Sequence, residues 1–280
     1  MKKFMAIAVA LMAVFGGWST VQGAVIVEYT DSPTVASDSD GDTGGSQTVA
    51  ITDFSTTAND LLIVSFGQEH TNGNGNSINN VKYGGADMTL AVSENLEHSD
   101  GDNDNVAHSS IWYIDPANGT GDITFDTGGI TFTRYMVNAV LVSGENGPVA
   151  FNASATNSNQ AADVDSSLEA GPISVEAGDF VIDSLTETDG RITFTTKGLV
   201  DSGGTLLNEF GSGEFSAFGA SYRVSDSSQD LSTTWVWTDD AGNYNLSALA
   251  MASFTEIPEP ASVILLALGS LALLKRRTRR

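Results

Sequence analysis

The chain has 280 residues, of which 35 are acidic and 12 are basic, and it contains no cysteine. Seven basic residues lie at the two ends of the chain, so between Ala24 and Leu274 five basic side chains stand against all 35 acidic ones. Such an acidic body repels phosphate backbones and anionic lipid headgroups, which argues against nucleic acid as a partner and against peripheral membrane attachment by the body. The lack of cysteine excludes disulfides, thiolate zinc sites and a cysteine nucleophile.

The first 23 residues have the pattern of a secretory signal peptide. Lys2 and Lys3 precede an apolar stretch from Phe4 to Phe15, and small residues lead to the site Val21-Gln22-Gly23. A basic segment, an apolar segment and a small-residue cleavage site occur in this order in signal peptides, and the apolar run is too short for an ordinary transmembrane helix. We therefore predict export through the Sec translocon and removal of residues 1–23.

The body from Ala24 to Glu256 has the alternation typical of β-strands. Apolar residues occupy every second position from Tyr244 to Phe254, while Leu249 and Met251 indicate that the second face of this strand is also partly covered. Clusters of Gly, Asn, Asp and Ser separate such segments, and helical periodicity is nearly absent. The sequence thus predicts an all-β fold, a single antiparallel two-sheet β-sandwich over residues 24–256, with neither a proline-rich linker nor a repeat of fixed period.

Two loops rich in aspartate are the candidate cation sites. Carboxylates two residues apart in a tight turn can point several oxygens at one calcium ion, which takes six to eight oxygen ligands. Neither loop has the spacing of an EF-hand, and a solvated acidic loop is the alternative. Calcium is the cofactor that the sequence suggests, and the residues concerned are Asp38, Asp40 and Asp42 in the first loop and Asp100, Asp102 and Asp104 in the second.

Aromatic and histidine side chains provide two further candidates. Trp235 and Trp237 lie on one face of a predicted strand, where they would form a carbohydrate-binding platform if exposed and part of the core if buried. His70, His98 and His108 fall within 39 residues, near glutamates, but without the close spacing that places zinc ligands on one face of an element. A zinc site therefore has less support than surface histidines.

Catalytic signatures are absent from the sequence. It contains no Gly-x-Ser-x-Gly elbow, no His-Glu-x-x-His motif and no phosphate-binding glycine loop. A glycosidase would need two carboxylates across a scissile bond, and 35 acids do not reveal which pair that would be. We assign no catalytic residue and expect a protein that is not an enzyme.

The last 24 residues combine a proline motif, an apolar run and a basic end. Pro258-Glu259-Pro260 precedes the uncharged residues 261–274, which as a helix span about 21 Å, less than the roughly 30 Å of a hydrocarbon core. The basic residues of segment 275–280 can snorkel and stay cytoplasmic by the positive-inside bias. We predict a C-terminal transmembrane helix that holds the precursor in the inner membrane with residues 24–256 outside.

The C-terminal segment, residues 257–280, resembles the PEP-CTERM sorting signal of Gram-negative bacteria. The resemblance rests on Pro258-Glu259-Pro260, the apolar helix and the arginine-rich end, together with the N-terminal signal. It implies recognition by exosortase, a membrane-embedded cysteine-protease-like enzyme, removal of the tail near the motif, and release or attachment at the cell surface. Proteins of this family usually accompany the production of extracellular polysaccharide, which is therefore an expected partner. A plain tail anchor is the alternative.

Four segments of the body resemble, in order, a jelly-roll-like domain that is common in secreted bacterial proteins; they are residues 59–64, 81–86, 111–113 and 139–142. This resemblance implies a fold only. We expect an exported, non-catalytic protein of the cell surface or extracellular matrix. The alternative is a carbohydrate-binding module or a polysaccharide-active hydrolase that uses the same export route.

Overall fold

The structure is a computed structural model of the whole chain. It describes the body of the protein apart from several connecting loops, and the two terminal segments lie outside the described residues. The described residues are 24–37, 46–49, 60–71, 78–98, 105–115, 121–127, 133–161, 165–188, 192–211, 216–239 and 245–257.

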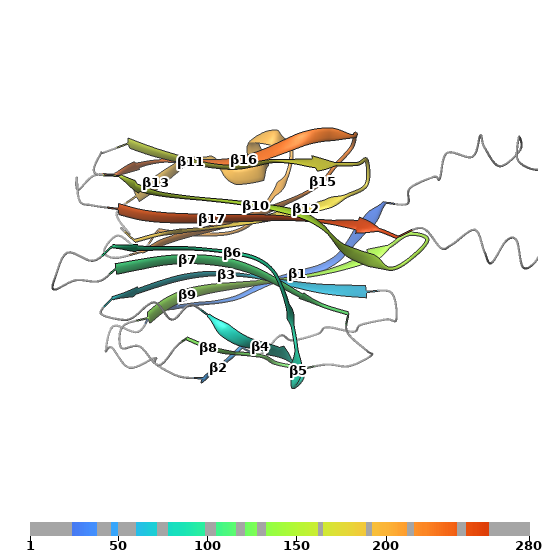
Figure 1. Ribbon diagram of the computed structural model, residues 1–280, viewed down its shortest axis with the longest axis horizontal. Helices are drawn as coiled ribbons and strands as arrows, with labels where there is room; N and C mark the ends of the chain where they lie inside the picture. Colours follow the sequence, from blue (N-terminus) through green and yellow to red (C-terminus); the bar gives the residue numbers. More distant parts are fainter. Residues whose placement is uncertain are drawn as a thin grey trace, which may run out of the picture.

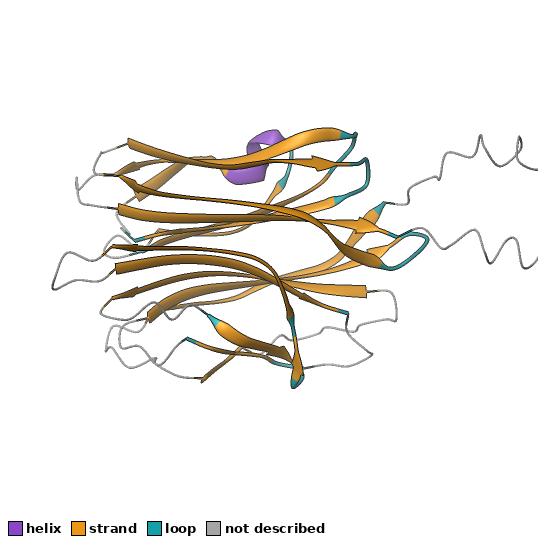
Figure 2. Ribbon diagram, in the orientation of Figure 1, coloured by secondary structure: helices purple, strands orange, loops and turns teal. Residues whose placement is uncertain are grey.

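The described residues form antiparallel β-strands and one short 3₁₀ turn, η1 (Gly198–Ser202), as Figure 2 shows. The strands of the first half of the chain are β1 (Val25–Ser37), β2 (Ser46–Val49), β3 (Asp60–Thr71), β4 (Asn79–Tyr83), β5 (Ala86–Asp87), β6 (Thr89–His98), β7 (Asn105–Ile114), β8 (Ile123–Asp126) and β9 (Thr133–Gly144). Those of the second half are β10 (Val149–Ala161), β11 (Asp165–Val175), β12 (Phe180–Glu187), β13 (Ile192–Lys197), β14 (Thr205–Gly211), β15 (Ala217–Val224), β16 (Gln229–Asp239) and β17 (Asn245–Glu256). The predicted all-β, antiparallel class is confirmed.

The strands form four sheets, which are stacked in Figure 1. The first outer sheet has the order β2-β8-β4-β5 and the first inner sheet β1-β9-β3-β7-β6. The second inner sheet has the order β10-β17-β12-β15-β14 and the second outer sheet β11-β16-β13. The expectation of two stacked sheets is therefore wrong in number: each half of the chain builds a two-sheet sandwich, and the two inner sheets pack against each other.

The inner sheets are apolar on both faces, and this is why four layers form. In β3, Leu62 and Val64 face the first outer sheet, whereas Leu61 and Ile63 face the second inner sheet. Successive side chains of a strand point to opposite faces, so each face of the inner sheets has its own buried cluster. The suggestion that the second face of the last strand is covered is confirmed, because Leu249 and Met251 of β17 are fully buried.

The two halves of the chain have the same topology. In the inner sheets, the order β10-β17-β12-β15-β14 of the second half corresponds strand by strand to the order β1-β9-β3-β7-β6 of the first half. In the outer sheets, the order β11-β16-β13 corresponds in the same way to β2-β8-β4. Among the described strands the two-residue β5 is without a counterpart. The inner sheets also contact each other through equivalent strands. β3 packs on its counterpart β12. β6 packs on β10, and the equivalent pair, β14 and β1, is also in contact.

The registers of the two halves agree as well. Val25 pairs with Gly144 where β1 meets β9, and Val149 pairs with Glu256 at the corresponding point of β10 and β17. A β-bulge lies between the third and fifth residues of both β1 and β10, and another lies between the second and fourth residues of both β6 and β14. Bulges are specific, retained features of a ladder. The shared positions therefore indicate an internal duplication.

Candidate functional site: the sorting junction

The last strand ends directly before the predicted sorting motif. β17 pairs with β10 up to Glu256 on one side and with β12 up to Phe254 on the other. The N–H of Ile257 donates a hydrogen bond of 2.8 Å to the carbonyl of Pro148, and a carboxylate oxygen of Glu256 accepts one of 2.9 Å from the N–H of Asn146. The final described residue is thus held on the turn that joins the two halves, one residue before Pro258.

The first described residue is held on the same turn. The carbonyl of Ala24 accepts a hydrogen bond of 3.1 Å from the N–H of Glu145, and the N–H of Val25 donates one of 2.9 Å to Gly178. Gly144 makes this crowding possible, because a Cβ there would lie 2.0 Å from the carbonyl oxygen of Gly147. The start of β1 and the end of β17 therefore lie side by side at one end of the molecule (Figure 1).

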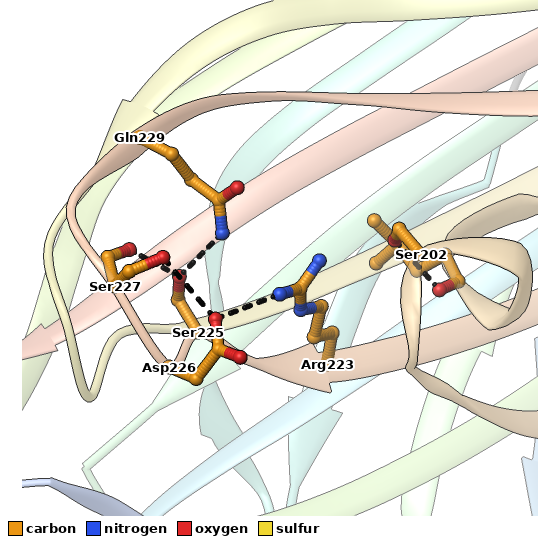
Figure 3. A network of polar contacts seen from close by, with 7 residues as sticks. Ser202, Arg223, Ser225, Asp226, Ser227 and Gln229 are labelled. Atoms are coloured by element: carbon orange, nitrogen blue, oxygen red, sulfur yellow. Dashed lines mark hydrogen bonds and ion pairs between the residues drawn. The ribbon is translucent and has the colours of Figure 1, made fainter.

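A hydrogen-bonded turn between β15 and β16 completes this end. Arg223 donates to the carboxylate of Asp226 at 3.0 Å, and the side chain of Gln229 donates to the hydroxyl of Ser225 (Figure 3). The carbonyl of Ser225 accepts a hydrogen bond of 2.7 Å from Gly178, which connects the turn to the start of the chain. These polar groups bind one another, so the turn serves to shape the end of the body.

A fully buried carboxylate lies between the sheets of the second half. Asp183 of β12 accepts hydrogen bonds from the N–H groups of Leu199 and Ser221, at 3.2 and 2.8 Å, and from the hydroxyls of Ser221 and Thr233. Burial raises the pKa of the Asp183 carboxyl to about 6, against the opposing effect of these hydrogen bonds. Because its donors come from β15, β16 and η1, the carboxylate ties η1 to the core.

A second buried carboxylate joins the two halves. Glu69 of β3 accepts a hydrogen bond of 3.1 Å from the guanidinium of Arg134 and a further one from the hydroxyl of Ser216. Arg134 also donates to Ser216 at 3.3 Å. Ser216 precedes β15, whereas Glu69 and Arg134 belong to the first inner sheet. Asp183 and Glu69 are therefore both engaged by donors of the fold itself.

The predicted calcium and sorting residues are not placed by the structure. Asp38, Asp40, Asp42, Asp100, Asp102, Asp104, Pro258, Glu259 and Pro260 lie outside the described residues. Within the described ranges no group of three or more potential metal-ligating side chains occurs. His108 is buried in β7, and the side chains of His70 and His98 are outside the described part. The calcium interpretation stays a prediction.

The two predicted carbohydrate-binding tryptophans belong to the core. Trp235 is 0% and Trp237 1% exposed, and both pack edge-on against Phe194 of the neighbouring strand β13. Gly219 of β15 leaves room for the indole ring of Trp235, because a Cβ at this position would lie 2.4 Å from Cη2 of Trp235. The exposed platform that the carbohydrate interpretation requires is thus not formed by this pair.

Sequence reasoning missed Asp183 and the shared position of the chain ends. A single carboxylate among apolar residues of β12, in Phe180-Val181-Ile182-Asp183, was the available signal for the first. The second depends on the long-range pairing of β1, β10 and β17, and no local pattern reveals it.

The fold and the junction define a class of protein: an all-β body whose last strand is followed directly by a C-terminal sorting segment. Residues 256–280 match the family model for the PEP-CTERM protein-sorting motif, so the chain carries this motif and the predicted resemblance is confirmed. No curated protein and no solved structure matches the chain.

The motif indicates exosortase-dependent export of a surface protein, through a membrane-anchored precursor, with exosortase as the processing partner. The described residues include no helix long and apolar enough to cross a membrane. The predicted helix of residues 261–274 and the signal peptide of residues 1–23 lie outside them.

Proposed function

We propose that the protein is a non-catalytic β-sandwich protein that acts at the cell surface or in the extracellular polysaccharide matrix after exosortase has removed its tail. The observation that carries the proposal is the match of residues 256–280 to the sorting motif directly after the last strand of an all-β body. In this arrangement the C-terminal segment directs export, and the β-sandwich body carries the function outside the cell.

The hydrogen bonds of two buried carboxylates, Asp183 and Glu69, support a non-catalytic role for these two groups. Asp183 and Glu69 accept hydrogen bonds from several elements of the fold, and this use as structural acceptors explains their burial without a substrate. The alternative of a carbohydrate-binding module relied on exposed Trp235 and Trp237. Both are buried, so we do not base that alternative on them.

The charge of the surface favours an uncharged polysaccharide as the matrix partner. Each of the four basic side chains that the structure describes is paired with a carboxylate; the pairs are Lys82–Asp87, Arg134–Glu69, Lys197–Glu209 and Arg223–Asp226. Between Ala24 and Leu274 the chain has 35 acidic residues against five basic ones, so the body presents net negative charge, which repels anionic polymers.

The intact mass of the protein recovered from outside the native cell tests the sorting step. We expect the wild type to lack about the first 23 residues and the C-terminal tail, and a variant with Pro258→Ala, Glu259→Ala and Pro260→Ala to keep the tail and remain in the membrane fraction. A wild-type product that retains Arg280 would contradict processing and leave a simple anchor.

Incubation of the processed protein with extracellular polysaccharide from the same cells tests the functional assignment. We expect the protein to sediment with the polymer and the polymer length to stay unchanged. Release of new reducing ends, lost in a heat-denatured control, would refute the non-catalytic role. A protein that stays entirely in the supernatant would refute the matrix assignment.

A further inference from the structure

One edge of the second inner sheet differs from the other exposed edges. β10 has 13 residues and contains neither a charged residue nor a proline. All other edge strands longer than four residues carry one or the other among the described elements: β1, β6, β11, β13 and β14. Charges and prolines on edge strands prevent pairing with another chain, so β10 lacks the usual protection.

β10 is an edge strand that pairs with β17 on one side only among the described strands. The N–H of Ser158 donates to the side-chain oxygen of its neighbour Asn157 at 2.9 Å, and is therefore directed away from the ladder with β17. Residues of the same parity share this direction in an antiparallel strand. The N–H groups of Ser154 and Thr156 thus also point outward, where another strand could accept their hydrogen bonds.

The side chains of β10 suit pairing with an identical strand. Ala153 and Ala155 face the core of the second half, and Asn157 is fastened to the carbonyl of Glu169 in β11 at 2.7 Å. The exposed side chains are short or uncharged and can form hydrogen bonds across a strand pair. They are Asn152, Ser154, Thr156, Asn157, Asn159 and Gln160.

We propose that β10 is a self-association surface, at which β10 of a second copy adds antiparallel and extends the second inner sheet across both molecules. The uncharged side chains of β10, which can form hydrogen bonds with an identical set, select a second copy as the occupant. Two bodies with 35 acidic and few basic residues repel each other over most of their surfaces. The uncharged edge of β10 is where two copies can approach with the least repulsion, and a two-fold axis brings each β10 residue opposite an equally uncharged one.

Sedimentation velocity of the processed protein over a range of concentrations tests the proposal. We expect a monomer–dimer equilibrium whose dimer fraction rises between 10 mM and about 200 mM salt, because salt screens the repulsion between the bodies. Thr156→Lys places like charges near each other in the pair and should raise the dimer dissociation constant about tenfold or more. Thr156→Pro removes an outward N–H without breaking the ladder to β17 and should act in the same direction.

The matched control is Thr205→Lys, an exposed threonine in β14 at the opposite edge of the same sheet. It adds the same charge and should leave the dimer unchanged. Circular dichroism and the melting temperature of each variant distinguish loss of pairing from loss of folding. A wild type that stays monomeric at every concentration, or a dimer that persists in folded Thr156→Lys, would overturn the proposal.

Discussion

At the scale of single residues, Asp183 is an ionisable group that is fully buried between two sheets. The strand around it is buried on both faces, and its carboxylate is satisfied only because β15, β16 and η1 each supply donors. Its titration is therefore coupled to the packing of three elements.

Stability should depend on pH through Asp183. The pKa of this carboxyl is about 6 in the fold and 3.8 in the unfolded chain, so between these values the folded state binds the extra proton. The free energy of unfolding should fall by about 3 kcal/mol as pH rises from below 4 to above 6 and then level off. Asp183→Asn should lack this component, which urea unfolding at a series of pH values would measure. Parallel pH curves for both proteins would contradict it.

Gly198 shares this buried site. Its φ is +60°, and a Cβ would lie 2.4 Å from a carboxylate oxygen of Asp183 and 2.5 Å from Nε1 of Trp235. Gly198→Ala should lower the free energy of unfolding by about 2 to 4 kcal/mol, from backbone strain and overlap together. Gly203, with φ +92° and open space around its Cβ position, is the control. Gly203→Ala should cost about 1 kcal/mol, from the backbone alone. Equal losses would show that the contacts of Gly198 do not matter.

At the scale of elements, β16 carries the two largest side chains of the second core. Trp235→Ala should lower the free energy of unfolding by about 3 to 5 kcal/mol, because it leaves a cavity between the second inner and outer sheets. Trp112→Ala is the control: this indole is only half-buried and donates to Ser110 at 3.1 Å, so its loss should cost less. Chemical denaturation measures both. Retained stability with lost polysaccharide binding in Trp235→Ala would instead place this indole on the surface.

The elements also show how far sequence reasoning reaches. Alternation of apolar residues predicted strands such as β17 correctly, because side-chain direction in a strand is a local property. The length of β1 was not predicted: the strand continues to Ser37, directly before Asp38, with a second irregularity in its ladder. The number of sheets was missed because a strand that is apolar on both faces does not show what covers it.

The duplication was missed for a different reason. Equivalent residues of the two halves are separated by different numbers of positions in different strands, as Val25 and Val149 or Gly144 and Glu256 show, so a search for a fixed period does not detect it. The sorting segment was predicted because its motif, apolar run and basic end are consecutive in the chain. The junction with the body depends on tertiary pairing and required the structure.

At the scale of the whole molecule, the acidic body makes stability dependent on cations. Calcium should raise the melting temperature beyond sodium chloride of equal ionic strength if an aspartate loop binds the ion. Asp40→Ala or Asp102→Ala should remove this additional rise, and magnesium is the control for divalent charge. An equal rise with calcium, magnesium and matched sodium chloride would reduce the effect to screening.

The position of β17 sets the order of events during export. The strand is last in the chain, yet it lies inside the second inner sheet, between β10 and β12. Until residue 256 has crossed the membrane, both of these strands lack their neighbour and the second half cannot close. The body therefore completes its folding only after residue 256 has been exported. A chain halted before residue 245 would arrive outside with two open, pairing-competent edges, and it should be an early target of envelope proteases.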